Sequence, residues 1–151
     1  MTLGFYINYR LEGIPGYYVS ERESTLRREK LINQSLNFNE SMVICNIESG
    51  FPTLNEARIN LKEIIIKEKK NNTKAIKLIH GYGSSGVGGK LRQGLRESLR
   101  RRKKEGEIKG FIIGENFSNR PENDEYIKQN PFFVNDPDFG KGNLGITIII
   151  L

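Results

Sequence analysis

Cysteine, histidine and long hydrophobic runs are scarce in this chain of 151 residues. Cys45 is the one cysteine and His80 the one histidine, so an internal disulfide cannot form and a zinc-finger type of site lacks its ligands. No segment approaches the roughly 18 apolar residues of a membrane-spanning helix. Residues 1–10 mix polar and aromatic side chains, unlike a signal peptide. We therefore expect a cytoplasmic protein in a reducing compartment, with no membrane partner.

Positive charge is concentrated in one segment. The net charge is +6, and residues 90–104 hold eight of the 24 Lys and Arg residues but a single acid, Glu97. The rest of the chain is close to neutral, with 16 basic and 17 acidic residues. Such a field is typical of proteins that bind a polyanion, most often nucleic acid. The alternative is a solvated basic helix face without a ligand.

The sequence predicts an N-terminal extension and one α/β domain. Residues 1–40 contain aromatic runs around a Pro-Gly turn and then a polar helical pattern, which predict a hairpin and/or a helix. Residues 41–151 alternate apolar runs of strand length with amphipathic helices, in the order β-α-β-α-β-β. Thr53 and Glu56 match a capping box at the first of these helices. We expect a two-layer α/β sandwich in which two helices cover a four-stranded mixed sheet.

A long polar segment, residues 115–143, precedes the final strand. It is rich in Asn, Pro, Asp and Gly and too long for an ordinary connection, so we expect a functional flap or a partly ordered excursion. Asp136 and Asp138 could hold a divalent ion, but an Asp-Pro-Asp turn is the favoured interpretation. The β-branched residues 145–151 predict an interior strand.

A glycine-rich loop separates the second predicted strand from the second helix. The sequence from His80 to Arg92 is HGYGSSGVGGKLR. Its backbone amides, the helix dipole and the first basic side chains favour phosphate as a ligand. The G-x-G-x-x-G spacing of Gly81–Gly86 also matches a dinucleotide fingerprint, although the helix is too cationic and the expected acid is missing. A P-loop is excluded because Leu91 replaces its Ser or Thr. A structural turn without a ligand is the other alternative.

Three motifs, in order, resemble those of the Smr (small MutS-related) domain family. His80-Gly81-Tyr82-Gly83 with Leu91-Arg92 is similar to the His-Gly-x-Gly…Leu-Arg block of the family. Residues 142–148 are similar to its closing Gly-x-x-Gly-Val-Thr strand, and Asn55-Glu56-Ala57 resembles its Glu-Ala helix. The resemblance covers about residues 42–151. It implies a fold like the C-terminal domain of translation initiation factor three, DNA or RNA binding, and a nicking endonuclease activity in some members. A role in DNA repair or recombination is part of the same expectation, and ribosome association is possible but not shown by the sequence.

The first motif of the family, Leu-Asp-Leu-His/Arg-Gly, is altered here. It falls on Cys45-Asn46-Ile47-Glu48 and then Ser49-Gly50, with Asn46 at the Asp position and Glu48 at the His/Arg position. An amide cannot act as a general base or carry the charge that holds a metal. Cleavage would therefore require Glu48 to substitute for the aspartate.

The candidate residues form a catalytic and a binding group. His80 and Glu48 would act as acid and base in a nuclease, the one case in which Mg²⁺ is implied. The alternative is that His80 binds phosphate or the loop backbone without chemistry. Tyr82 is either a base-stacking or a packing residue. The predicted nucleic-acid-binding residues are Gly81, Tyr82, Gly83, Ser84, Ser85, Gly86, Gly88, Gly89, Lys90, Arg92, Arg96 and Arg100.

The favoured hypothesis is a nucleic-acid-binding module for structured or single-stranded DNA or RNA. A nicking endonuclease that uses His80 is the first alternative. A dinucleotide-binding protein is the remote one.

Overall fold

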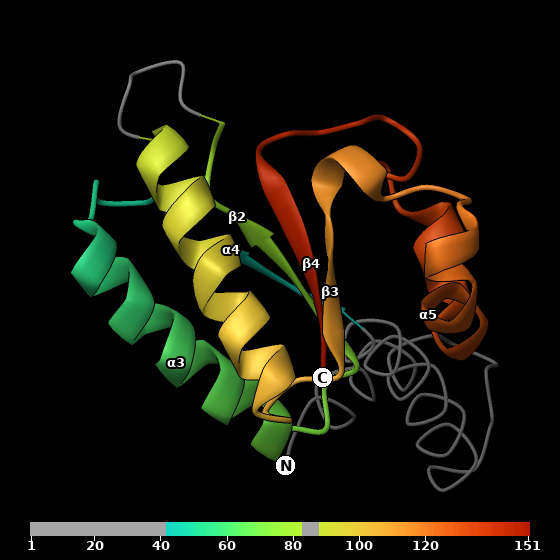
Figure 1. The fold of residues 1–151 in the computed structure, drawn as a ribbon, viewed down its shortest axis with the longest axis horizontal. Helices are drawn as coiled ribbons and strands as arrows, with labels where there is room; N and C mark the ends of the chain where they lie inside the picture. The colour runs from blue at the N-terminus through green and yellow to red at the C-terminus, as the bar shows by residue number, and fades with distance from the viewer. Residues whose placement is uncertain (1–41, 83–87) are drawn as a thin grey trace, which may run out of the picture. The chain divides into compact units, whose positions relative to one another are not determined.

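The computed structural model describes residues 42–82 and 88–151 (Figure 1). The predicted N-terminal extension lies outside the described residues, and so do Gly83, Ser84, Ser85 and Gly86 of the glycine-rich loop. In chain order the elements are β1 (Met42–Asn46), α3 (Leu54–Lys70), β2 (Ala75–Ile79), α4 (Gly88–Lys104), β3 (Gly110–Ile113), η1 (Gly114–Asn116), η2 (Pro121–Asn123), α5 (Asp124–Gln129), η3 (Pro131–Asn135) and β4 (Ile146–Ile150).

The four strands form one mixed sheet in the order β1-β2-β4-β3. β1 and β2 pair in parallel, and β4 runs antiparallel to both of its neighbours. The predicted α/β class, the four-stranded mixed sheet and the order β-α-β-α-β-β are confirmed. β4 lies between β2 and β3 and is buried along its whole length, as its apolar sequence predicts.

Helices α3 and α4 cover one face of the sheet (Figure 1). The capping box at the start of α3 is present: the Thr53 hydroxyl accepts a hydrogen bond from the Glu56 amide, and the Glu56 carboxylate accepts one from the Thr53 amide. Such a cap stabilises a helix by about 1 kcal/mol. The core under the helices is formed by Ile47, Ala57, Leu61, Ile65, Ile76, Leu78, Leu91, Leu95, Leu99, Ile108 and Ile149.

The segment between β3 and β4 covers the opposite face of the sheet, where α5 lies in Figure 1. The expectation of a partly ordered excursion is wrong, because this segment forms three 3₁₀ helices and α5 over a second core, whereas a functional role for it stays a prediction. Phe117 and Phe133 are fully buried there, with ring centroids 5.4 Å apart, and Phe139 packs edge-on against Phe117. The polar composition of the segment conceals these aromatic anchors, which add a third layer to the predicted sandwich.

Lys77 fixes this third layer to the sheet. Its side chain is buried, and Nζ lies 2.6 Å from Asp136 Oδ1 and 2.7 Å from Asp138 Oδ2. Burial alone would lower the pKa of Lys77, but the hydrogen bonds to the two carboxylates raise it above its ordinary value. The same lysine lowers the pKa of Asp138. The Asp136 carboxylate also accepts a hydrogen bond from the Asp138 amide, so the Asp-Pro-Asp segment forms a turn around a buried ammonium group.

Lys77→Met should reduce the free energy of unfolding by about 3 kcal/mol, because it leaves two carboxylates facing an apolar side chain. Urea denaturation at pH 7 measures this loss. The difference from the wild type should narrow below about pH 4, since protonation then removes the uncompensated charges. The exposed Lys128 of α5 provides the control, and Lys128→Met should change stability by less than about 0.5 kcal/mol. Equal losses in the two variants would contradict an anchoring role for Lys77.

Candidate nucleic-acid interface

One edge of the sheet collects most of the predicted site residues. The register aligns Asn46 with Ile79 and Ile79 with Ile146, so the ends of β1 and β2 lie beside the start of β4. β3 ends at the same edge, because Ile113 pairs with Thr147. We call this region the carboxyl edge; it consists of residues 46–53, 80–82, 88–92, 114–115 and 143–146. Ligand sites in α/β folds commonly lie at such an edge.

His80 is completely buried just after β2. Its Nδ1 lies 2.7 Å from the carbonyl oxygen of Gly81, and its Nε2 lies 2.8 Å from the hydroxyl oxygen of Thr147. A carbonyl can only accept, so Nδ1 carries the proton and Nε2 accepts from Thr147. Burial lowers the pKa of His80 to about 4, and the positive charges of Arg96 and Arg92 act in the same direction. His80 is therefore neutral near pH 7, and both of its nitrogens have partners.

Arg96 occupies the centre of the same cluster. Its guanidinium group donates to both carboxylate oxygens of Glu115, at 2.8 and 2.7 Å, and to the hydroxyl of Thr147 at 3.0 Å. It also donates to the carbonyl of Ile146. Burial opposes ionisation of Glu115, but the hydrogen bonds from Arg96 hold its pKa below the ordinary value. Arg96 thus joins α4 to β4 and to the end of β3. We call His80, Arg96, Glu115 and Thr147 the polar cluster.

Glu48 and Asn46 have different environments at the end of β1. The Asn46 side-chain oxygen accepts hydrogen bonds from the amides of Glu48 and Ser49, so this side chain closes the turn. The Glu48 carboxylate lies against Gly81, where an added Cβ would come within 2.7 Å of both of its oxygens. Gly81 also has a φ of +73°, so glycine is required there for both conformation and space. The Glu48 carboxylate therefore lies beside the start of the glycine-rich loop.

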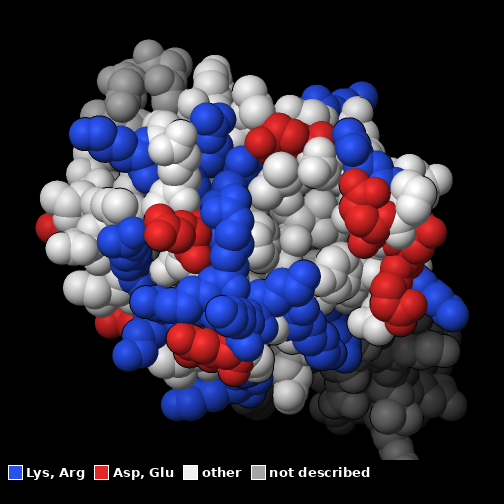
Figure 2. Space-filling view, viewed as in Figure 1, with Lys and Arg blue, Asp and Glu red and all other residues white. Residues whose placement is uncertain are grey.

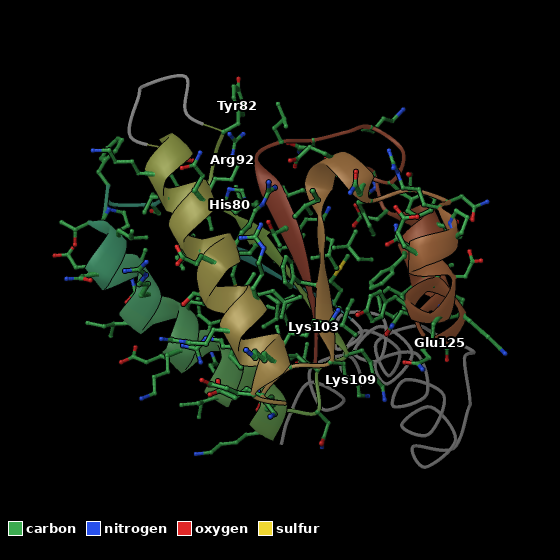
Figure 3. The ribbon with its side chains drawn as sticks, viewed as in Figure 1. His80, Tyr82, Arg92, Lys103, Lys109 and Glu125 are labelled. Atoms are coloured by element: carbon green, nitrogen blue, oxygen red, sulfur yellow. The ribbon has the colours of Figure 1, made fainter. Side chains whose placement is uncertain are left out.

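The basic residues of α4 divide into paired and solvent-facing groups. Arg96 pairs with Glu115, and the buried Arg102 pairs with Glu107. The other six make no ion pair within residues 42–82 and 88–151; they are Lys90, Arg92, Arg100, Arg101, Lys103 and Lys104. Lys and Arg side chains form a stripe along α4 in Figure 2. The stripe begins at the carboxyl edge, where Figure 3 shows Arg92 beside His80 and below Tyr82.

The structure brings only part of the predicted set together. Glu48, His80, Gly81 and Tyr82 lie at the carboxyl edge, with the first turn of α4, which contains Gly88, Gly89 and Lys90. Arg100 lies about 12 Å further along the helix than Arg92. Arg96 lies inside the polar cluster instead of facing solvent. The roles assigned to these residues stay predictions.

Two members of the polar cluster were missed at the sequence level. Thr147 lies in the stretch that resembles the Gly-Val-Thr strand of the Smr family, and this was the available signal for it. No sequence signal indicated Glu115, because it lies after β3 and pairs with Arg96 of α4 only in the folded chain.

The described residues do not offer a complete set of metal ligands. No group of three or more His, Cys, Asp or Glu side chains gathers within residues 42–82 and 88–151. The side-chain oxygen of Asn46 accepts hydrogen bonds within its turn, and the Glu115 carboxylate is bound by Arg96. Of these three side chains at the carboxyl edge, Glu48 is the remaining candidate metal ligand. These side chains therefore do not form a Mg²⁺ site.

Within residues 42–82 and 88–151, no helix has the length and apolar character needed to cross a membrane.

The titration of His80 tests the polar cluster directly. The pKa of about 4 in the folded protein lies below the ordinary value of 6.5, so the unfolded chain takes up the proton first as the pH falls. The contribution of His80 to stability should be complete above about pH 6.5 and lost between about pH 6.5 and 4. NMR of the imidazole nitrogens should show the Nδ1–H tautomer from pH 5.5 to 8 in the sole histidine, with the urea-unfolded chain as reference. A folded-state pKa near 6.5 would contradict this arrangement.

The comparison with family models agrees with the sequence motifs. The family model of the Smr domain matches residues 50–114, from the turn after β1 to the end of β3. The crystal structure of the Smr domain of Thermus thermophilus MutS2 is similar, with 22% sequence identity and a TM-score of 0.45. That similarity covers 72% of this chain and 96% of the other. No curated protein matches the chain. The match of the family model confirms the resemblance of this chain to the Smr domain family over residues 50–114.

Proposed function

We propose that this chain binds the phosphate backbone of nucleic acid at the carboxyl edge and along α4. The observation that carries the proposal is the stripe of six basic side chains on α4 that have no acidic partner in the described part of the chain. Their repulsion is a cost that an anionic partner would remove. The start of α4 adds the backbone amides of its first turn and the positive end of a 17-residue helix, which also favour phosphate.

The polar cluster supports binding by fixing the shape of the edge. The Gly81 carbonyl accepts a hydrogen bond from His80, while the amides of His80 and Gly81 both donate to the carbonyl of Gly145. These bonds hold the first residues of the glycine-rich loop against the start of β4. Lys90 and Arg92 follow in the first turns of α4, directly after the loop. In this arrangement His80 positions the loop and needs no proton transfer.

Cleavage of a phosphodiester is the second candidate, and one observation favours it. The Glu48 carboxylate lies against Gly81, next to the sole histidine of the chain. Against it, a general base must reach the proton that it removes, and His80 is fully buried with both nitrogens engaged. We therefore favour binding without acid–base catalysis by His80.

Removing two solvent-facing charges from α4 tests the binding surface. Arg92→Gln combined with Arg100→Gln should weaken binding to all sequences alike, because phosphate contacts do not read bases. The slope of log K against log salt should fall in magnitude by about one for each arginine that no longer neutralises a phosphate. Fluorescence anisotropy of a labelled oligonucleotide over a salt series measures both effects.

The matched control removes two exposed lysines from α3, as Lys62→Gln combined with Lys70→Gln. This control variant has the same change in net charge, on the neighbouring helix, and its affinity for the oligonucleotide should fall much less. Equal losses in the two double variants would refute a localised surface. Binding that is insensitive to salt would refute the phosphate interface and favour the dinucleotide alternative.

A cleavage assay separates binding from hydrolysis. Supercoiled plasmid and a folded RNA, each with and without Mg²⁺, should remain intact and show a salt-sensitive mobility shift. Glu48→Gln and His80→Ala are included; the first keeps the volume at the turn and the second removes a buried cluster residue. Strand scission by the wild type that a folded Glu48→Gln protein lacks would instead establish a nuclease.

A further inference from the structure

Phe51 has an unusual position in the turn between β1 and α3. Its side chain is 89% exposed, and its backbone has a φ of +52°, in the left-handed region. Both features are unfavourable: burial of a phenylalanine stabilises a fold by about 1.5–3 kcal/mol, and a left-handed residue that is not glycine costs about 1–2 kcal/mol. Nothing in the packing of the described residues explains an aromatic side chain here. Strained and exposed residues of this kind point to function.

The turn holds Phe51 at the carboxyl edge. Its amide donates a hydrogen bond to the Glu48 carbonyl at 3.1 Å, and the next residue, Pro52, is buried beside the Thr53 cap. Glu48 in turn lies against Gly81, whose neighbour Tyr82 is 57% exposed. The contact between Glu48 and Gly81 therefore connects the turn that holds Phe51 with the segment that holds Tyr82. In Figure 3 the Tyr82 side chain points outward from the domain above Arg92.

The exposed aromatic side chains of the described residues lie at the carboxyl edge. Seven large hydrophobic side chains are exposed in the described part of the chain, and five of them are aliphatic: Ile44, Ile59, Ile66, Val134 and Leu144. The two aromatic ones, Phe51 and Tyr82, are both at the carboxyl edge, which also includes Leu144 and the first turn of α4. Exposed aromatic rings beside cations are the combination that binds unpaired bases, which stack on the rings while their phosphates contact the basic side chains.

We infer that Phe51 stacks on an unpaired base, and that together with Tyr82 it directs the domain toward single-stranded or looped nucleic acid. The bases of a continuous duplex are stacked on each other, so they do not offer their faces to these rings. This inference rests on the proposed function, because the cations of α4 supply the phosphate contacts. It adds a preference for unpaired segments and a residue that determines it.

The absence of tryptophan from the chain permits a direct test. Phe51→Trp provides a single tryptophan at the turn and keeps an aromatic face. Titration with a uridine or thymidine oligonucleotide of about 12 nucleotides, within the usual range of site sizes, should quench its emission. A blunt duplex of the same length should quench much less. Val134→Trp, at another exposed position on η3, is the control and should show no quenching with either probe.

Loss of the ring separates stacking from folding. Asparagine tolerates the left-handed region, so Phe51→Asn should fold with a melting temperature at least equal to that of the wild type. It should bind the single strand about tenfold more weakly and leave duplex affinity unchanged. Phe51→Tyr should retain the single-strand affinity. Ile59→Asn, an exposed apolar position on α3, should not affect binding to either probe.

Two outcomes would overturn the inference, and they are distinguishable. Salt-sensitive binding with equal affinity for both probes and no effect of Phe51→Asn would refute base stacking and leave the phosphate interface intact. No binding of either probe by any variant would refute the proposed function and the inference together. Comparison of the uridine and thymidine oligonucleotides also shows whether RNA or DNA is preferred.

Discussion

The arrangement of the carboxyl edge depends on one hydroxyl group, that of Thr147 in the central strand β4. This hydroxyl donates to Nε2 of His80 and accepts from Nε of Arg96, and a single hydroxyl can do both. It thereby joins the end of β2 to α4, and Arg96 extends the connection to Glu115 after β3. The contacts of Thr147 with His80 and Arg96 are buried, so removal of one of these three side chains would leave the others without a partner in a medium where this is costly. The start of the glycine-rich loop is thus held by the polar cluster.

The same cluster changes the meaning of the charge pattern. Residues 90–104 carry eight basic side chains, but Arg96 and Arg102 face acids that lie outside this segment. Arg96 joins α4 to β4 and to the end of β3, and Arg102 binds the turn that follows α4. The remaining six basic side chains define the positive electrostatic field of the helix surface. A buried cation with a bidentate partner contributes little to that field, because its charge is neutralised at contact distance. The structural and the ligand-directed charges of α4 therefore alternate along one helix, and sequence counting cannot separate them.

Local patterns predicted most of the fold. The capping box of Thr53 and Glu56, the strand-helix alternation and the interior strand at the C-terminus depend on neighbouring residues, and all three are present. The errors concern contacts between distant residues. Lys77 is 59 residues from Asp136, and Arg96 is 51 residues from Thr147, so no spacing rule indicates either contact. Likewise, Phe117 and Phe133 are isolated aromatic residues in a polar segment, and only the folded chain shows that they meet.

The polar cluster also limits what His80 can do without rearrangement. For His80 to act on a substrate, Nε2 would have to lose the Thr147 hydroxyl, which would then donate elsewhere or remain unsatisfied. Protonation of His80 would place a second positive charge beside Arg96, whose field already lowers its pKa. Both changes would weaken the polar cluster that holds the start of the glycine-rich loop in place. The features that make His80 a good anchor therefore make it a poor acid or base, and this conflict favours a surface that holds phosphates over one that cleaves between them.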